Sequence, residues 1–321
     1  MEKCGSRFMA GLEERGSLPG FGSLCPCGPG ARMTRLFCRA DHPKLDDSRA
    51  AASLARMESD WKGKIVIVTG GGGGMGQAAA QRFAGAGART FVFGRTLESL
   101  QAAATISPEI IPVVCDVADT ASIASAMRVV LAEGAPFALI HTAGINTPDR
   151  FLDHADPGRL VSEESWRRVM EINVLGVANM IQAVTQPMAA AGGGRIVVVS
   201  STAGHGFDSY AGVPYTASKW AVHGMLFTAR MQLNARGIVV SEYAPGEADT
   251  PLVKKRPVQP AAEHKSAMIT CADCADALFF IASQPHSMSI IQLPAYQPFG
   301  GMPPQITAPW LAGLDIKPAG T

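Results

Sequence analysis

The sequence predicts a doubly wound α/β domain in three layers, with a mostly parallel, seven-stranded sheet between two layers of helices. From Lys64 onward, short runs rich in Val, Ile and Phe alternate with longer helical patterns, the order that gives a parallel sheet covered on both faces. The first of these runs ends at Thr69 and passes through five consecutive glycines into an alanine-rich helical pattern. Seven strands in this rhythm predict one domain rather than two.

Each expected strand is short and apolar, as buried parallel strands should be. The expected strands are 64–69, 89–94, 110–115, 137–142, 195–200, 238–243 and 289–294, and the expected helices are 75–86, 96–104, 119–133, 162–190, 215–235 and 271–283. Ser162 is placed to cap the fourth helix, with two glutamates in its first turn. Thr270 and Asp273 form a Thr-x-x-Asp capping signature for the last helix.

Composition restricts the class of protein. The chain has 321 residues, 47% of them hydrophobic, and a formal net charge of +1, which argues against nucleic acid or an anionic membrane as the main partner. No apolar run approaches the roughly 20 residues of a membrane span. The seven cysteines are odd in number and four lie before residue 39, so we expect no disulfide framework and a reducing, cytoplasmic location.

The ends of the chain differ from its middle. Residues 1–60 scatter Gly, Pro, Arg and Cys without a period, which predicts a disordered extension. We expect the folded domain over 61–300 and a tail over 301–321. The extension lacks the features of a signal or transit peptide, and its cysteine spacing matches no closed zinc site. Cys271 and Cys274 likewise lack further ligands nearby, so no metal site is predicted.

The glycine-rich segment after Thr69 predicts a phosphate site. Gly70 can turn the chain off the strand, Gly74 can let backbone approach a pyrophosphate, and Gly76 can let the helix pack closely on the sheet. The phosphates would bind N–H groups at the positive end of the helix dipole, next to Met75. Five glycines could also form a flexible linker, but their position between a strand and a helix favours a dinucleotide site.

The ends of the second and third strands bear on the adenosine half of such a ligand. Arg95 follows the second strand, where no acid is present. An acid there would bind the ribose 2′-OH of NAD, whereas an arginine suits the 2′-phosphate of NADP, so NADP(H) is favoured and NAD(H) stays possible. Asp116 ends the third strand and could accept a hydrogen bond from adenine. It could instead cap the next helix, a role that Asp119 fits better.

The fourth strand ends in small residues, Ala143 and Gly144, which can let a cofactor lie against backbone. His141 precedes them in an apolar run. A histidine in such a position is more often a hydrogen-bonded structural residue than a catalytic base.

A serine, a tyrosine and a lysine further along the chain suggest chemistry. Ser201 follows the fifth strand, and Tyr215 and Lys219 lie one helical turn apart on one face. A phenol has a pKa near 10, and an ammonium one turn away would favour phenolate and bring that pKa toward the working range. The serine hydroxyl could hydrogen-bond a carbonyl oxygen. A Tyr-x-x-x-Lys pair is common by chance, but its place downstream of the glycine motif makes it specific.

These motifs together resemble the short-chain dehydrogenase/reductase superfamily over roughly residues 62–300. The resemblance is carried by Thr69, Gly70, Gly74, Gly76, Asp116, Ala143, Gly144, Asn173, Ser201, Tyr215, Lys219, Pro245 and Gly246. It implies a single-domain Rossmann-like fold and NAD(P)(H)-dependent interconversion of an alcohol and a carbonyl by direct hydride transfer. It also implies a small-molecule substrate and a homodimer or homotetramer.

The resemblance assigns roles residue by residue. Tyr215 would be the general acid/base, and Lys219 would bind the nicotinamide ribose and tune Tyr215. Ser201 would orient the substrate, and Asn173 would hold a water in a proton relay. The implied cofactor-binding set is Thr69, Gly70, Gly74, Met75, Gly76, Arg95, Asp116, Val117, Ala143, Gly144, Tyr215, Lys219, Pro245, Gly246 and Thr250.

The chain departs from the family pattern at three places, one of which is the last strand: the segment 289–297 lacks the usual Gly-Gly ending. His141 and Thr142 replace the two asparagines of Asn-Asn-Ala-Gly, which puts in doubt contacts that stabilise the central strand. The usual Arg-Val-Asn before the Pro-Gly pair is Val239, Val240 and Ser241, followed by Glu242.

Two alternatives to a general alcohol/carbonyl oxidoreductase remain. One is a fatty-acyl or polyketide 3-oxoacyl reductase of the same family. The other is a catalytically silent nucleotide-binding regulator, against which the complete Asn–Ser–Tyr–Lys set argues. We expect substrate selectivity to reside in segments 146–161, 203–213 and 251–268.

The composition of the extension predicts that a chain starting at Met57 folds and binds cofactor like the full-length protein, because residues 1–56 offer little that could build a core. Thermal unfolding of both chains, followed by circular dichroism, tests this. Loss of the cooperative transition in the shorter chain would show that the extension contributes to folding.

Overall fold

The computed structural model describes residue 57 and residues 60–147, 149, 151, 160–206, 211–255, 259–285 and 287–297. Apart from Met57 and Asp60, the expected N-terminal extension lies outside the described residues, as does the expected tail over 301–321. All of these residues belong to the second of the two compact units of the chain, Ala51–Thr321.

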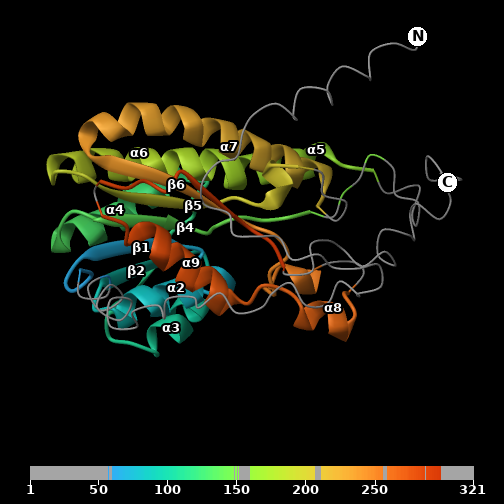
Figure 1. The fold of residues 1–321 in the computed structure, drawn as a ribbon, viewed down its shortest axis with the longest axis horizontal. Coiled ribbons are helices and arrows are strands. Elements are labelled where there is room, and N and C mark those ends of the chain that lie inside the picture. Colours follow the sequence, from blue (N-terminus) through green and yellow to red (C-terminus); the bar gives the residue numbers. More distant parts are fainter. Residues whose placement is uncertain are drawn as a thin grey trace, which may run out of the picture. The chain divides into compact units, whose positions relative to one another are not determined.

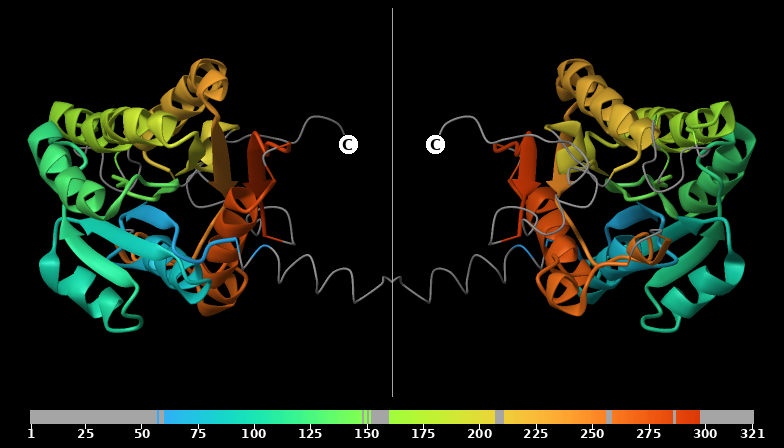
Figure 2. Two further views of the ribbon diagram at one scale, coloured as in Figure 1. Left: turned by 90° about the vertical axis from the view of Figure 1, so that its left-hand side faces the viewer. Right: turned by 90° about the vertical axis from the view of Figure 1, so that its right-hand side faces the viewer.

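Seven strands form a single sheet in the order β3-β2-β1-β4-β5-β6-β7 (Figure 2). Every neighbouring pair is parallel, which confirms the doubly wound fold class. The strands are β1 (Ile65–Thr69), β2 (Arg89–Gly94), β3 (Ile110–Val114), β4 (Ala138–His141), β5 (Gly194–Val199), β6 (Ile238–Pro245) and β7 (Gln292–Ala295). The chain reverses its direction of winding between β1 and β4, and ligands of such sheets bind at the carboxyl ends of the strands there.

Helices cover both faces of the sheet, and each layer encloses its own apolar core (Figure 1). On one face lie α2 (Gly74–Gly85), α3 (Leu97–Ala104) and α9 (Cys271–Ala282). On the other lie α4 (Thr120–Glu133), α6 (Gly176–Ala190) and α7 (Val213–Leu233). Among the described residues, the remaining α-helices are α5 (Glu163–Met170), which leads into α6, and the short α8 (Ala262–Ser266).

Trp61 joins the start of the described domain to its core. Its ring is 1% exposed and packs edge-on against Phe83, with 4.7 Å between centroids. Its indole Nε1 donates a 2.7 Å hydrogen bond to Ser283 Oγ at the end of α9. A segment far away in the sequence is thereby tied to the first residues of the domain.

The capping predictions are confirmed. Ser162 accepts a hydrogen bond from the Ser165 amide at the start of α5. Thr270 and Asp273 form a reciprocal capping box at the start of α9. Cys271 and Cys274 are therefore first-turn residues of a helix that opens in the ordinary way.

Three expected elements differ most from the structure. The helix expected over 162–190 contains a π-helical turn, Glu171–Leu175, between α5 and α6. The helix expected to open at Tyr215 begins at Val213, because Pro214 suits a first turn whose N–H groups need no partner. The last strand, expected over 289–294, is Gln292–Ala295, and the Ile291 carbonyl just before it accepts hydrogen bonds from the Glu242 amide of β6 and from Arg230.

Candidate functional site

Two threonines join the carboxyl ends of the central strands. The Thr142 hydroxyl donates a 2.6 Å hydrogen bond to the Thr69 carbonyl. The Thr69 hydroxyl accepts from the backbone amides of Thr142 and Ala143, both at 3.2 Å. This reciprocal pair ties β1 to β4 at the switch point, where the family pattern would have used an asparagine.

The glycine loop fits tightly against this junction. Gly70 has φ +69°, and a Cβ there would lie 2.9 Å from Thr142 Oγ1. A Cβ on Gly76 would lie 2.3 Å from the Gly70 carbonyl oxygen, so the start of α2 rests directly on the loop. Gly74 has φ +56°, and a Cβ there would lie 2.9 Å from Pro251 Cδ. Side chains are therefore excluded at all three of the motif glycines.

The N-terminus of α2 fits an anionic ligand. Its N-cap residue, Gly73, makes no side-chain capping hydrogen bond, and the first turn holds no acidic residue. Met75, the second residue of the helix, is partly buried and packs against the core. Uncapped N–H groups at the positive end of a 12-residue helix can bind the phosphates of a dinucleotide.

The segment after β6 lies over the same loop. β6 ends at Pro245, and the Gly246 amide donates a 2.7 Å hydrogen bond to the Ala295 carbonyl. The chain then passes Thr250, whose Cβ would lie 3.7 Å from a Cβ on Gly74. The structure thus brings together the glycine motif and the Pro-Gly segment, two regions about 170 residues apart in the sequence.

The ends of β2 and β3 present the residues expected at the adenosine half. Arg95 is exposed and makes no hydrogen bond or ion pair with any described residue. The Asp116 carboxylate accepts a 3.0 Å hydrogen bond from the Ala118 amide, while Asp119 caps α4. The Val117 side chain is buried against Gly176 of α6, so only its backbone can face a ligand.

His141 is buried beneath the site without a hydrogen-bonding side chain or carbonyl among the described residues. Burial and, to a lesser extent, the nearby Lys219 charge lower its pKa to about 3, while the Ala143 backbone opposes this shift. His141 is therefore neutral. We expected a hydrogen-bonded structural histidine, but neither ring nitrogen has a hydrogen-bond partner among the described residues.

Asn173 lies in the π-helical turn between α5 and α6. Its Oδ1 accepts a 2.8 Å hydrogen bond from the Ile145 amide, and its Nδ2 donates to the Ile145 carbonyl and the Ser218 hydroxyl. Single π-helical turns occur often at functional sites. Here the turn directs a side chain that is 1% exposed at the loop after β4, beside Gly144.

Lys219 is the most constrained residue of the site. Its side chain is buried, and its Nζ donates a 3.0 Å hydrogen bond to the Val199 carbonyl and lies 5.4 Å from the centroid of the Tyr215 ring. Burial lowers its pKa from 10.5 to about 8, and the charge of Glu242 opposes this shift. The ammonium thus lies between β4, β5 and the tyrosine.

Ser201 is brought to the same place by a short 3₁₀ turn, Thr202–Gly204. The turn packs directly on α7, because a Cβ on Gly204 would lie 2.8 Å from the Lys219 carbonyl oxygen. The Ser201 hydroxyl accepts a 3.2 Å hydrogen bond from the Ala203 amide, and the residue is 8% exposed. Its hydroxyl hydrogen is therefore left to donate to another acceptor.

Sequence reasoning missed several residues of the site. Thr142 appeared only as a departure from the family pattern, and Ser218 and Pro251 were not singled out. A cluster of Glu242, His205 and His223 behind the tyrosine–lysine pair was missed as well. The only signal for it in the sequence was the acid at an otherwise apolar position of β6.

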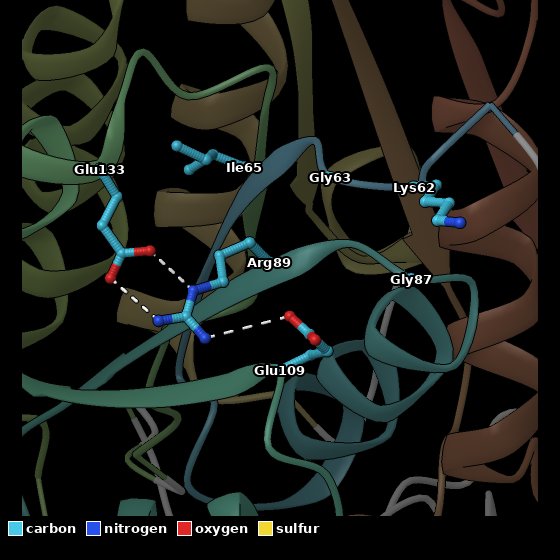
Figure 3. Close-up of a pocket in the computed structure, with 7 residues that line it drawn as sticks. All are labelled: Lys62, Gly63, Ile65, Gly87, Arg89, Glu109 and Glu133. Atoms are coloured by element: carbon cyan, nitrogen blue, oxygen red, sulfur yellow. Dashed lines mark hydrogen bonds and ion pairs between the residues drawn. The ribbon is translucent and has the colours of Figure 1, made fainter.

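A surface hollow elsewhere is separate from this site. Lys62, Gly63, Ile65, Gly87, Arg89, Glu109 and Glu133 line it (Figure 3). Arg89 makes two hydrogen bonds to the Glu133 carboxylate, at 2.7 and 3.0 Å. Because Ile65 and Arg89 are the first residues of their strands, the hollow lies at the amino ends of the sheet, opposite the edge where α/β sheets bind ligands.

No helix in the described part of the chain combines the length and hydropathy needed to cross a membrane.

Several proteins of known activity are similar to this chain. A sorbitol dehydrogenase of Cereibacter sphaeroides is 35% identical over 190 residues, 58% of this chain and 71% of the relative. A cis-4-hydroxycyclohexanecarboxylate dehydrogenase of Sinomonas cyclohexanicum is 32% identical over 237 residues, 71% of this chain and 92% of the relative.

A crystal structure of a 3-oxoacyl-[acyl-carrier protein] reductase from Brucella melitensis superposes with a TM-score of 0.65 at 25% identity, covering 76% of this chain and 92% of the other. The sequence profile of the short chain dehydrogenases matches residues 64–260, more than half of the chain. The chain therefore belongs to the short-chain dehydrogenase/reductase family, whose members are NAD(P)(H)-dependent oxidoreductases that interconvert an alcohol and a carbonyl.

Proposed function

We propose that Asn173, Ser201, Tyr215 and Lys219 form the active site of an oxidoreductase that uses Tyr215 as its general acid/base. One observation carries this proposal: the buried Lys219 ammonium lies 5.4 Å from the centroid of the Tyr215 ring and donates a hydrogen bond to a backbone carbonyl. A buried cation beside a phenol favours the phenolate form, as proton transfer at neutral pH requires.

Each residue then has a separate task. The Ser201 hydroxyl donates to the substrate oxygen and orients it, and Tyr215 gives or takes the proton on that oxygen. Lys219 stabilises the tyrosine electrostatically and binds the ribose hydroxyls. Asn173 fixes the loop after β4 through its hydrogen bonds to Ile145, and we assign it the water molecule of a proton relay. When bound, the nicotinamide supplies or accepts the hydride.

Removing the phenolic hydroxyl tests the central assignment. Tyr215→Phe keeps the ring and its packing, so we expect cofactor binding to persist while kcat falls by about 10²–10⁴-fold, as is typical when a general acid/base is lost. Ser201→Ala should likewise keep cofactor affinity and lose rate. Fluorescence titration with cofactor, beside steady-state kinetics, measures both. Near-wild-type turnover in Tyr215→Phe would contradict the proposal.

The buried lysine predicts a pH dependence of stability. Between pH 8 and 10.5 the unfolded chain holds a proton on Lys219 that the folded chain has lost, so the free energy of unfolding rises with pH in this window. Below pH 8 the full penalty of about 3 kcal/mol applies, the equivalent of the fall in its pKa. Lys219→Met lacks this titration.

Urea unfolding at pH 7 and pH 10 measures the effect. The wild type should gain stability relative to Lys219→Met as the pH rises, because all other groups titrate in both proteins. Equal pH dependence of the two proteins would show that the ammonium is not desolvated.

We further propose a preference for NADP(H). The support is that Arg95 is exposed and makes no hydrogen bond or ion pair with a described residue, and that it directly follows β2, whose Phe93 carbonyl accepts a 3.1 Å hydrogen bond from the Gly71 amide of the glycine loop. A guanidinium there suits a 2′-phosphate. NAD(H) would lack that group.

Arg95→Ala should therefore lower kcat/KM with NADP(H) by about tenfold or more, since a charge-assisted contact is worth roughly 1.5–3 kcal/mol. The value with NAD(H) should change little. Equal use of the two cofactors by the wild type, with no effect of the substitution, would refute the preference.

The substrate is proposed as a small-molecule alcohol or carbonyl compound. The relatives named above suggest a screen with sorbitol, cis-4-hydroxycyclohexanecarboxylate and a 3-oxoacyl thioester. Parts of the segments expected to select the substrate, 152–159, 207–210 and 256–258, lie outside the described residues. A 3-oxoacyl reductase therefore stays a second proposal.

A homo-oligomer is proposed from one face of α7. Trp220, Phe227 and Met231 are 50%, 51% and 81% exposed and follow one another at helical spacing. A Cβ added to Gly224, between them, would meet nothing within 4 Å. A stripe of this kind suits association with a second copy of the chain.

Phe227→Lys should reduce the mass of the particle in light scattering after gel filtration. Val129→Lys on α4, also an exposed apolar position, is the matched control and should leave the mass unchanged. A monomeric wild type would contradict the proposal.

A further inference from the structure

The carboxylate of Glu242 is buried in the middle of β6. The residue is 0% exposed and pairs with Val198 on β5 and Gln292 on β7. Burial by itself would raise its pKa, but hydrogen bonds from Ser200, His223 and His205 together hold the pKa below its ordinary value. Glu242 is therefore a negative charge in the interior.

Its two oxygens bond to different elements. Oε1 lies 2.9 Å from His205 Nε2, and Oε2 lies 2.9 Å from His223 Nδ1. The Gln292 amide reaches Oε2 at 3.5 Å, and Arg230 Nη2 lies 3.9 Å from the same oxygen. One carboxylate therefore links β6 to the turn after β5, to α7 and to β7.

The linked elements are those that bear the proposed catalytic groups. His205 directly follows the 3₁₀ turn that begins after Ser201. His223 lies one helical turn beyond Lys219 and two beyond Tyr215, on the same face of α7. Glu242 is thus hydrogen-bonded to both sides of the serine–tyrosine–lysine set.

Two histidines and a carboxylate can also bind zinc. Here the space among them is taken by Gln292, whose Nε2 lies 2.7 Å from His205 Nδ1, 3.4 Å from His223 Nδ1 and 3.5 Å from Glu242 Oε2. The Arg230 guanidinium, which is also buried, already faces the carboxylate. A divalent cation would have to displace the amide and lie beside a buried positive charge, so hydrogen bonding accounts better for the cluster.

We propose that Glu242 is a positioning residue: its charge keeps Lys219 in the ammonium form, and its hydrogen bonds to His205 and His223 hold the Ser201 turn against α7. The inference rests on the function proposed above. Glu242 pairs with Val198 on β5, and Lys219 Nζ donates to the carbonyl of the next residue, Val199, so the strand register brings the two charges to one place. Lys219 is also faced by neutral His141 from β4 and by Tyr215 from its own helix. Among these, Glu242 is the group whose charge opposes the desolvation of the ammonium.

Glu242→Gln tests the charge, because it keeps the shape of the side chain. We expect the alkaline limb of the pH profile, where kcat falls as the pH rises, to move to lower pH by about half to one unit. A direct ion pair would shift it by about 1–3 units, but Glu242 is shared among several partners. Cofactor affinity, measured by fluorescence titration, should weaken at a correspondingly lower pH. Tyr243→Phe, the next residue on the strand, removes only a contact with Cys274 and is the matched control.

His223→Leu tests the link, because it removes the bond from α7 while leaving the charge. It should lower kcat by about tenfold, within the range for a displaced catalytic group, without moving the alkaline limb. If Glu242→Gln does not fold, Glu242→Asp takes its place: the charge remains, so the alkaline limb should stay where it is while kcat falls.

An alkaline limb that Glu242→Gln leaves unmoved would overturn the electrostatic role, and a wild-type kcat in His223→Leu would overturn the tether. A rise in Tm on adding ZnCl₂ to the wild type, but not to Glu242→Gln, would also overturn the proposal, since the carboxylate would then bind a cation. If Tyr215→Phe is inactive and Glu242→Gln behaves as the wild type, only this inference fails. If Tyr215→Phe stays active, the proposed function fails.

Discussion

The burial of the Lys219 ammonium is the constraint on which the proposed site depends. An isolated cation in a protein interior is unfavourable, and this one is retained with one hydrogen bond within the described part of the chain, to the Val199 carbonyl. The surrounding structure is arranged to hold it. The loop after β4 approaches it at Gly144, the turn after Ser201 packs on its backbone, and a buried carboxylate lies on the adjacent strand. A lysine placed here for stability alone would be a poor choice, because an apolar side chain would avoid the desolvation.

The cofactor half of the site depends on close backbone packing instead of charge. The threonine pair fixes the distance between β1 and β4, and that distance leaves no room for a Cβ at Gly70 or Gly76. The strand order switches at this junction, the place where sheets of this kind bind their ligands. The two halves meet at the end of β4, since Thr142 belongs to the first and Gly144 to the second.

The fold could be predicted closely because its signals are local. Apolar runs of five or six residues between helical periods identify buried parallel strands, and capping residues identify where helices begin. The last strand was the least accurate prediction. Ile290 and Ile291 satisfy the apolar pattern, yet the paired strand begins only at Gln292, and the Ile291 carbonyl also accepts a hydrogen bond from Arg230 of α7. That contact joins residues 61 apart in the sequence, so a local pattern could not reveal it.

The residues of the candidate site likewise divide into those that a local sequence signal identifies and those that only the fold brings together. Tyr215 and Lys219 could be paired from their spacing on a helix, and the motif glycines from their place after a strand. The partners of Glu242 could not be found by this means, since the turn after β5, α7 and β7 meet it only through the sheet register. Yet the acid itself could be noticed. A glutamate in a strand that is buried on both faces must find partners in the fold, because an unpaired buried carboxylate would be strongly unfavourable. Such a residue therefore indicates a polar network before its members are known, and here the network adjoins the tyrosine and lysine that the motif had already marked.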